Sequence, residues 1–452
     1  MKRIRIYLAL VLLVLFASSA LAAEPRAPLA GLKLEPGTSI VLLGDSITHQ
    51  CLYTQYVEDY FYTRFPGMRL RLHNAGVSGA KARDALARFD RDVAHYKPAY
   101  VTVLLGMNDG LYQPYDQETF STYHQDMLAL VDRLKEIDAT PILITPTMYD
   151  ARAARAAGRD APERNEFYNS VLAYYGAWLR EVAVENGFGF VDMYSPLNNL
   201  TLKQRMTNPA FTMLKDAVHP GPGGQAVMAF ALVSDLGLQR QVSSIRIVRR
   251  RGRPVAKATG GTVQEVEFTD DGVSFRWSAD SLPWVLPEAA AVGAKLCGLG
   301  HRMSREALEV HGLAAGQYEL LIDDQPVGSY RSVALERHIE LQSNLKTPQY
   351  QQALEVAELN KQRNEGPVRA LRSEWLRFQQ HDRLQRQAEQ NPDNAKLADE
   401  VTQAAKQLEG MEDRITAHEQ AARELEDQIF QINQPKTRTY QLRRVTAKKT
   451  AK

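Results

Sequence analysis

Between residues 39 and 237, short apolar runs alternate with amphipathic stretches of helical length, and this alternation constrains the fold more than any other feature. Runs such as IVLL at 40–43 and VTVLL at 101–105 lack polar alternation, which is typical of strands buried on both faces. Strands that alternate with helices favour a parallel sheet covered by helices on both sides, so we predict an α/β domain over residues 30–240. The predicted strands are Ser39–Leu43, Arg69–His73, Tyr100–Leu104, Pro141–Thr145 and Gly189–Asp192. The predicted helices are Leu52–Arg64, Lys81–His95, Glu118–Ile137, Pro162–Asn186 and Gly223–Leu236.

The composition changes after about Gln241. Short runs rich in Val, Ile, Phe and Tyr follow, and turns rich in Gly and Asp separate them. One of these turns, IDDQPVG at 322–328, is typical of a hairpin. We therefore predict a small β-rich domain over residues 242–343.

A third composition, dominated by Gln, Glu, Ala, Leu and Arg, extends over residues 346–434. From Leu397 to Ile432, apolar or small residues recur at alternating spacings of four and three, which is the heptad pattern of a coiled coil. Asn391 and Pro392 are typical of a helix start. We predict two long helices joined near residues 387–392, which pack as a hairpin or form a homo-oligomer.

Both ends of the chain are basic. At the start, three basic residues precede the apolar run Ile6–Phe16 and an A-x-A arrangement at Ala20–Ala22, which is typical of a secretory signal peptide over residues 1–22. We therefore expect a secreted or periplasmic protein without a transmembrane segment after cleavage. The tail at 435–452 has seven basic residues and no acidic one, so we predict that it is disordered.

The charge and the cysteines narrow the classes of partner. The formal charge of +2 includes the three basic residues of the signal segment, so the rest of the chain is nearly neutral and no nucleic-acid partner is indicated. Cys51 and Cys297 stand 246 positions apart in different predicted domains, and we expect two unpaired buried thiols. The sequence has no Cys–His metal spacing, no Walker loop and no dinucleotide fingerprint, so no metal-binding or nucleotide-binding motif competes with the residues described next.

A candidate nucleophile follows the first predicted strand. Gly44-Asp45-Ser46 comes directly after the apolar run, which places Ser46 at the carboxyl edge of the sheet, where α/β proteins bind ligands. Gly44 permits a sharp turn, and the helix that follows presents its N-terminal N–H groups to developing negative charge.

A serine hydroxyl needs a base, and Asp216-Ala217-Val218-His219 provides a candidate pair near the end of the domain. A carboxylate three residues before a histidine can accept a hydrogen bond from Nδ1–H within one local turn. This bond would leave Nε2 of His219 facing Ser46, ready to accept the serine proton and deliver it to the leaving alcohol.

Two further polar segments follow the second and third predicted strands and reach the same edge. Gly79 lies in the NAGVSG segment, and Asn108 lies in GMND. Acyl transfer passes through a tetrahedral oxyanion that needs hydrogen-bond donors. The backbone N–H groups of Ser46 and Gly79 and the side-chain amide of Asn108 would supply three. We expect His49 to line this edge or cap a helix, and Asp109 to order the Asn108 loop.

Together these segments resemble the four sequence blocks of SGNH (GDSL-type) hydrolases, in the same order and after the corresponding strands, over roughly residues 36–237. The resemblance implies a flavodoxin-like three-layer sheet without metal or organic cofactor. It also implies that Ser46 is the nucleophile, His219 the base and Asp216 its orienting partner, with Ser46, Gly79 and Asn108 forming the oxyanion hole. The whole chain is similar to multidomain bacterial members with a β-rich and helical C-terminal extension.

From these features we expect a serine esterase that removes small acyl groups, foremost acetyl, from a carbohydrate. The residues above support the enzyme class. The inference that the substrate is a carbohydrate rests only on the predicted export and on the substrates that this family often takes. Two alternatives stay open. One is an acyltransferase that passes the acyl group to a sugar hydroxyl of an exported polysaccharide, and the other is a non-catalytic binding or scaffold protein.

Overall fold

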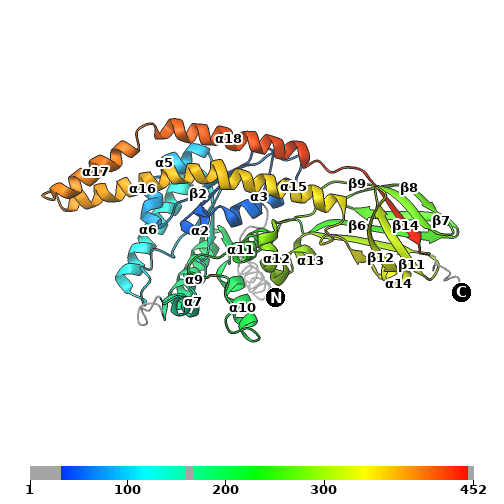
Figure 1. Cartoon of the computed structure of the whole chain (residues 1–452). Coiled ribbons are helices and arrows are strands. Elements are labelled where there is room, and N and C mark those ends of the chain that lie inside the picture. The colour runs from blue at the N-terminus through cyan, green and yellow to red at the C-terminus, as the bar shows by residue number, and fades with distance from the viewer. Residues whose placement is uncertain (1–31, 159–165, 446–452) are drawn as a thin grey trace, which may run out of the picture.

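The computed structural model describes residues 32–158 and 166–445 (Figure 1). Its first part is built on a five-stranded sheet in the order β2-β1-β3-β4-β5, and every neighbouring pair is parallel. This confirms the predicted flavodoxin-like α/β fold. The predicted signal peptide, residues 1–22, lies outside the described residues. The strands are β1 (Ser39–Gly44), β2 (Arg71–Gly76), β3 (Tyr100–Leu104), β4 (Thr140–Ile144) and β5 (Gly189–Val191).

Helices cover both faces of this sheet, and most lie where the sequence predicts them. The predicted helix at 81–95 is interrupted at Arg88, whose buried guanidinium donates to the carbonyl oxygens of Gly44 and Ala75. The predicted helix at 162–186 begins at Tyr168 within the described residues, and its predicted start at 162–165 lies outside them. The helices are α2 (Ser46–His49), α3 (Leu52–Arg64), α4 (Ala82–Ala87), α5 (Phe89–Asp92), α6 (Gln117–Glu136), α7 (Ala151–Ala156), α9 (Tyr168–Asn186), α10 (Tyr194–Arg205) and α11 (Pro222–Asp235). Of these, α2, α7 and α10 were not predicted.

The β-rich part contains two sheets that share one hydrophobic core. The first has the order β13-β10-β6-β7 and the second the order β12-β11-β14-β9-β8. Three short helices occur in this part of the chain. Helices α12 (Ala291–Cys297) and α13 (Leu299–Met303) lie between β9 and β10 in the sequence, and α12 packs against α11, whereas α14 (Ser332–Arg337) packs against β10. The strands are β6 (Gln241–Arg250), β7 (Arg253–Thr259), β8 (Gly261–Phe268), β9 (Gly272–Ala279), β10 (Arg305–His311), β11 (Gln317–Ile322), β12 (Gln325–Arg331), β13 (Ile339–Glu340) and β14 (Arg438–Arg444).

Strand β14 corrects the prediction of a disordered tail at 435–452. It lies between β9 and β11 as a central strand, so the β-rich part is completed by residues far beyond 343. Tyr440 and Leu442 point inward and are buried, Gln441 between them is half-buried, and Arg443 and Arg444 beyond them are exposed. This period of two is typical of a strand, and the basic composition of the tail obscured it. Residues 446–452 lie outside the described residues.

The segment at 346–434 forms a helical hairpin within one chain (Figure 1). The hairpin is one of the two arrangements that the sequence predicts. The first arm is α15 (Pro348–Arg363), a turn of π-helix at Asn364–Val368 and α16 (Arg369–Gln390). The second arm is α17 (Ala395–Gln407) and α18 (Met411–Ile432). Every heptad position from 397 to 432 is buried or half-buried. Homo-oligomer formation stays a prediction.

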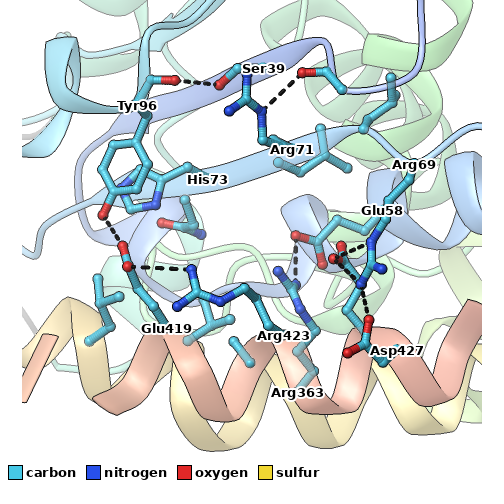
Figure 2. A pocket seen from close by; sticks show the side chains of 18 of the residues that line it. Ser39, Glu58, Arg69, Arg71, His73, Tyr96, Arg363, Glu419, Arg423 and Asp427 are labelled. Carbon is cyan, nitrogen blue, oxygen red and sulfur yellow. Dashed lines mark hydrogen bonds and ion pairs between the residues drawn. The ribbon is translucent and has the colours of Figure 1, made fainter. Parts of the chain in front are cut away.

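Figure 1 shows the hairpin running across the α/β domain, and charged pairs join the two parts where it crosses β2 and α3 (Figure 2). Arg69 Nη2, just before β2, lies 3.1 Å from Glu426 Oε2 on α18, and Arg363 Nη1 on α15 lies 3.0 Å from Glu58 Oε1 on α3. A cavity of about 830 Å³, lined by both charged and apolar side chains, lies between these elements. The hairpin thus shields β2, which would otherwise be an exposed edge strand open to pairing with other chains.

A fully buried ion pair holds the same interface further inside. Arg372 on α16 donates to both carboxylate oxygens of Asp92, with Nη1–Oδ1 at 2.8 Å, and neither side chain is exposed. Burial by itself raises the pKa of Asp92, but Arg372 and His73 outweigh it and lower the pKa to about 2. The pair therefore stabilises the fold above the ordinary carboxyl pKa of 3.8, and this contribution is lost as the pH falls toward 2.

Two smaller findings complete the description. Cys51 and Cys297 are buried and unpaired, as predicted. Within residues 32–158 and 166–445, no helix combines the length and the apolar character needed to cross a bilayer.

We predict that Arg372→Met lowers the free energy of unfolding by about 3–5 kcal/mol, because it removes one of the two buried arginines that neutralise Asp92 and leaves the carbonyl oxygens of Asn74 and Gly76 without this donor. Urea unfolding at pH 7 measures this. The control is Arg276→Met, which removes the exposed pair with Glu265 and should change the free energy by less than about 1 kcal/mol. An equal decrease in the free energy of unfolding in the two variants would show that the buried pair stabilises the fold no more than the exposed one.

Candidate active site

Ser46 stands at the junction of β1 and α2, and two glycines permit that junction. A Cβ atom at Gly44 would lie 2.1 Å from Thr48 Oγ1, and one at Gly76 would lie 2.4 Å from the backbone nitrogen of His49. Helix α2 therefore packs directly on the ends of β1 and β2. Asp45 caps this helix, since its carboxylate accepts the Ile47 N–H at 2.9 Å.

The structure brings Ser46, His219 and Asp216 into one chain of hydrogen bonds. His219 Nε2 lies 2.8 Å from Ser46 Oγ, and His219 Nδ1 lies 2.6 Å from Asp216 Oδ2. The other carboxylate oxygen, Asp216 Oδ1, accepts the backbone N–H of His219 at 2.7 Å and that of Val218 at 3.1 Å. The loop from 216 to 219 thus orients its own imidazole toward the serine, as a proton-accepting base requires.

The charge on Asp216 suits this arrangement. Burial raises its pKa, but the hydrogen bonds from His219 and Val218 outweigh burial, and the net pKa lies below the ordinary value. Its low pKa favours an ionised Asp216 carboxylate beside Nδ1 of His219. The side chains of His219 and Asp216 are 31% and 39% exposed, so the triad opens to solvent.

Asn108 and the Gly79 loop lie together at the same edge of the sheet. Asn108 Nδ2 donates to the carbonyl oxygen of Ala80 at 3.1 Å, and Asn108 Oδ1 accepts from the Tyr112 hydroxyl at 3.1 Å. These two bonds fix which end of the amide faces the loop. Gly79 has φ of +71°, a backbone conformation that favours glycine, and its N–H donates to no other group in the described part of the chain.

Two polar neighbours, His49 and Asp109, order the backbone around these groups. His49 Nδ1 accepts the Ser78 N–H at 3.2 Å, and burial followed by nearby arginines lowers the pKa of His49 to about 4. His49 is therefore neutral and holds the loop, as expected of a residue that lines this edge. Asp109 accepts the N–H groups of Gly106 and Ala82, and burial raises its pKa to about 7.

Sequence reasoning missed two sets of residues at this site. Asp150, six residues after β4, accepts from Arg205 Nη2 at 2.6 Å, and its backbone N–H donates to Ala217 in the triad loop. Its place after a strand was an available signal. Gln379 and Arg383 on α16 contact the Gly79 loop from the C-terminal hairpin. No local pattern could have revealed these two, because they lie about 300 positions from the loop.

Comparison with known proteins agrees with this geometry. The model of the GDSL-like lipase/acylhydrolase family matches residues 42–227. An acetylxylan esterase of Geobacillus stearothermophilus is 26% identical over 230 residues, which cover 46% of this chain and 98% of that protein. The solved structure of a gut microbial diltiazem-metabolizing enzyme is similar at a TM-score of 0.77 and 28% identity, covering 93% of this chain and all of that one.

The α/β domain is therefore a member of the SGNH (GDSL-type) hydrolase family. The protein is an acyl esterase, which is a carboxylic ester hydrolase.

We predict that Gly76→Ala destabilises the α/β domain by about 1–3 kcal/mol and lowers esterase activity, because the new Cβ displaces α2 and with it Ser46. Urea unfolding and hydrolysis of p-nitrophenyl acetate measure the two effects. Gly67→Ala is the matched control, since a Cβ there meets nothing within 4 Å. If both variants behave alike, close packing of α2 is not required.

Proposed function

We propose that this protein is an exported O-acyl esterase that removes acetyl groups from carbohydrate through an acyl-enzyme on Ser46. The observation that carries the proposal is the continuous hydrogen-bonded chain from Ser46 Oγ through His219 to the ionised Asp216. An alcohol, an imidazole and a carboxylate in this order activate a serine for attack on a carbonyl carbon.

The chemistry proceeds in two halves. Ser46 Oγ attacks the ester carbonyl while His219 Nε2 takes its proton, and Asp216 stabilises the imidazolium. The backbone N–H groups of Ser46 and Gly79 and the Asn108 amide would donate to the oxyanion. His219 then protonates the leaving alcohol, and an acyl-Ser46 ester remains. In the second half His219 activates water, which releases the acid and restores Ser46.

The choice of substrate rests on similarity and on exposure. The relative that matches the α/β domain is an acetylxylan esterase. The side chains of His219 and Asp216 are about one-third exposed, and an open triad suits a short acyl group carried by a bulky or polymeric alcohol. Diltiazem is a second substrate to test, because the structural neighbour that spans almost the whole chain metabolises it.

We predict that Ser46→Ala lowers kcat for acetate release by at least about 10³-fold, and Asp216→Asn by about 10²–10⁴-fold, with little change in KM. Acetate release from acetylated xylo-oligosaccharides and from p-nitrophenyl acetate measures both. Ser170→Ala, an exposed serine on α9, is the control and should keep full activity. Full activity of Ser46→Ala would reject the nucleophile.

The same assay separates hydrolysis from acyl transfer. With an unacetylated xylo-oligosaccharide added as acceptor, an esterase should yield acetate as the main product. A dominant acetylated acceptor would instead identify an acyltransferase.

We also propose export, on the basis of the basic and apolar N-terminus. The protein produced with its natural N-terminus should be recovered outside the cytoplasm, and N-terminal sequencing should begin at Ala23 or Glu24. Recovery of an intact Met1 in the cytoplasm would contradict export.

A further inference from the structure

Side chains of α16 donate to the backbone of β2 and the Gly79 loop at four carbonyl oxygens. Arg372 donates to Asn74 at 2.6 Å and to Gly76 at 3.0 Å. Gln379 Nε2 donates to the Ser78 carbonyl at 2.9 Å, and Arg383 Nη2 donates to that of Gly79 at 2.6 Å. The three donors are seven and four residues apart, so they share one face of α16. This face of α16 lies along the loop that contains Gly79, whose backbone N–H is a proposed oxyanion donor.

One of these bonds concerns the peptide unit that matters for catalysis. The carbonyl of Ser78 and the N–H of Gly79 belong to the same planar peptide unit, and in a trans peptide they point in opposite directions. The bond from Gln379 to the Ser78 oxygen therefore fixes the direction of the Gly79 N–H. It also polarises that N–H toward an acceptor, because bonded peptide groups reinforce one another.

The α/β domain holds the neighbouring peptide units but not this one. The Ser78 N–H donates to His49, the Ala80 N–H donates to the Val77 carbonyl, and the Ala80 carbonyl accepts from Asn108. For the peptide between Ser78 and Gly79, the bond from Gln379 is the only hydrogen bond within the described residues. A peptide that precedes glycine rotates at little cost, so its orientation depends on this contact.

The surroundings of Gln379 indicate a role beyond stability. The residue as a whole is 2% exposed, and its Oε1 atom has no hydrogen-bond partner among the described residues. Burying an unsatisfied amide oxygen costs free energy, so a purely structural position would favour an apolar side chain. Arg383 secures the helix beside it, since its Nε also donates to Asp84 at 3.2 Å.

We propose that Gln379 is a positioning residue for the oxyanion hole, and that Arg383 supports it, so the helical hairpin completes the catalytic unit. The proposal rests on the function proposed above. Gln379 touches no reacting atom; it acts through the Gly79 N–H. Removal of its donor leaves that N–H free to turn away from the developing oxyanion.

The test compares Gln379→Met with Gln380→Met. Gln380 is the adjacent glutamine, is exposed, and forms no side-chain hydrogen bond within the described part of the chain. We expect Gln379→Met to lower kcat for p-nitrophenyl acetate by about 10- to 100-fold with KM changed less than about twofold. Its affinity for phenylboronic acid, which forms a tetrahedral anion on a serine, should fall by a similar factor. Gln380→Met should match the wild type in both.

A second variant guards against misfolding. Gln379→Glu keeps the shape but cannot donate when ionised, and it should show the same loss of kcat. Unchanged kcat and boronate affinity in a folded Gln379 variant, with Ser46→Ala inactive, would overturn this inference and leave the proposed function intact. Full activity in Ser46→Ala would overturn both.

Discussion

The hydrogen bond between Ser46 and His219 joins segments 173 positions apart, and the arrangement of the active site depends on it. Three features make it attainable. The parallel sheet brings the carboxyl ends of its strands to one edge. Glycines at 44 and 76 let α2 pack against two of those ends. The loop from Asp216 to His219 orients the imidazole through bonds within four residues, so little of the geometry is left to distant packing.

The C-terminal hairpin packs on the α/β domain through a largely polar interface. The match to the acetylxylan esterase covers 98% of that protein but only 46% of this chain, so the α/β domain alone corresponds to that whole enzyme. Here α3 is buried along most of its length, and its acidic side chains find partners on α15, including the pair between Glu58 and Arg363. The buried pair of Arg372 with Asp92 continues this interface toward the Gly79 loop. The C-terminal hairpin therefore packs on the catalytic domain through buried contacts and is not an independent domain.

Much of the fold could be read from the sequence because its signals are local. Unbroken apolar runs marked β1 and β3. Ser46 directly follows β1, and Asp216 and His219 come shortly before α11, and the sequence located both of these elements. Two of the misses share one cause, which is that distant contacts decide the outcome. Strand β14 is a strand because β9 and β11 lie on either side of it, although its basic composition suggested a disordered tail. The contact of Gln379 with Ser78 has no trace in either segment alone, since it arises only when the hairpin docks.

Fluorophosphonate labelling followed by peptide mapping tests the central claim most directly. The reagent reacts with a serine only where a base activates it and nearby donors stabilise the tetrahedral intermediate. The structure predicts a single labelled residue, Ser46, and no labelling after His219→Ala. Labelling of another serine in the native protein, or unchanged labelling of Ser46 without the imidazole, would contradict the proposed triad.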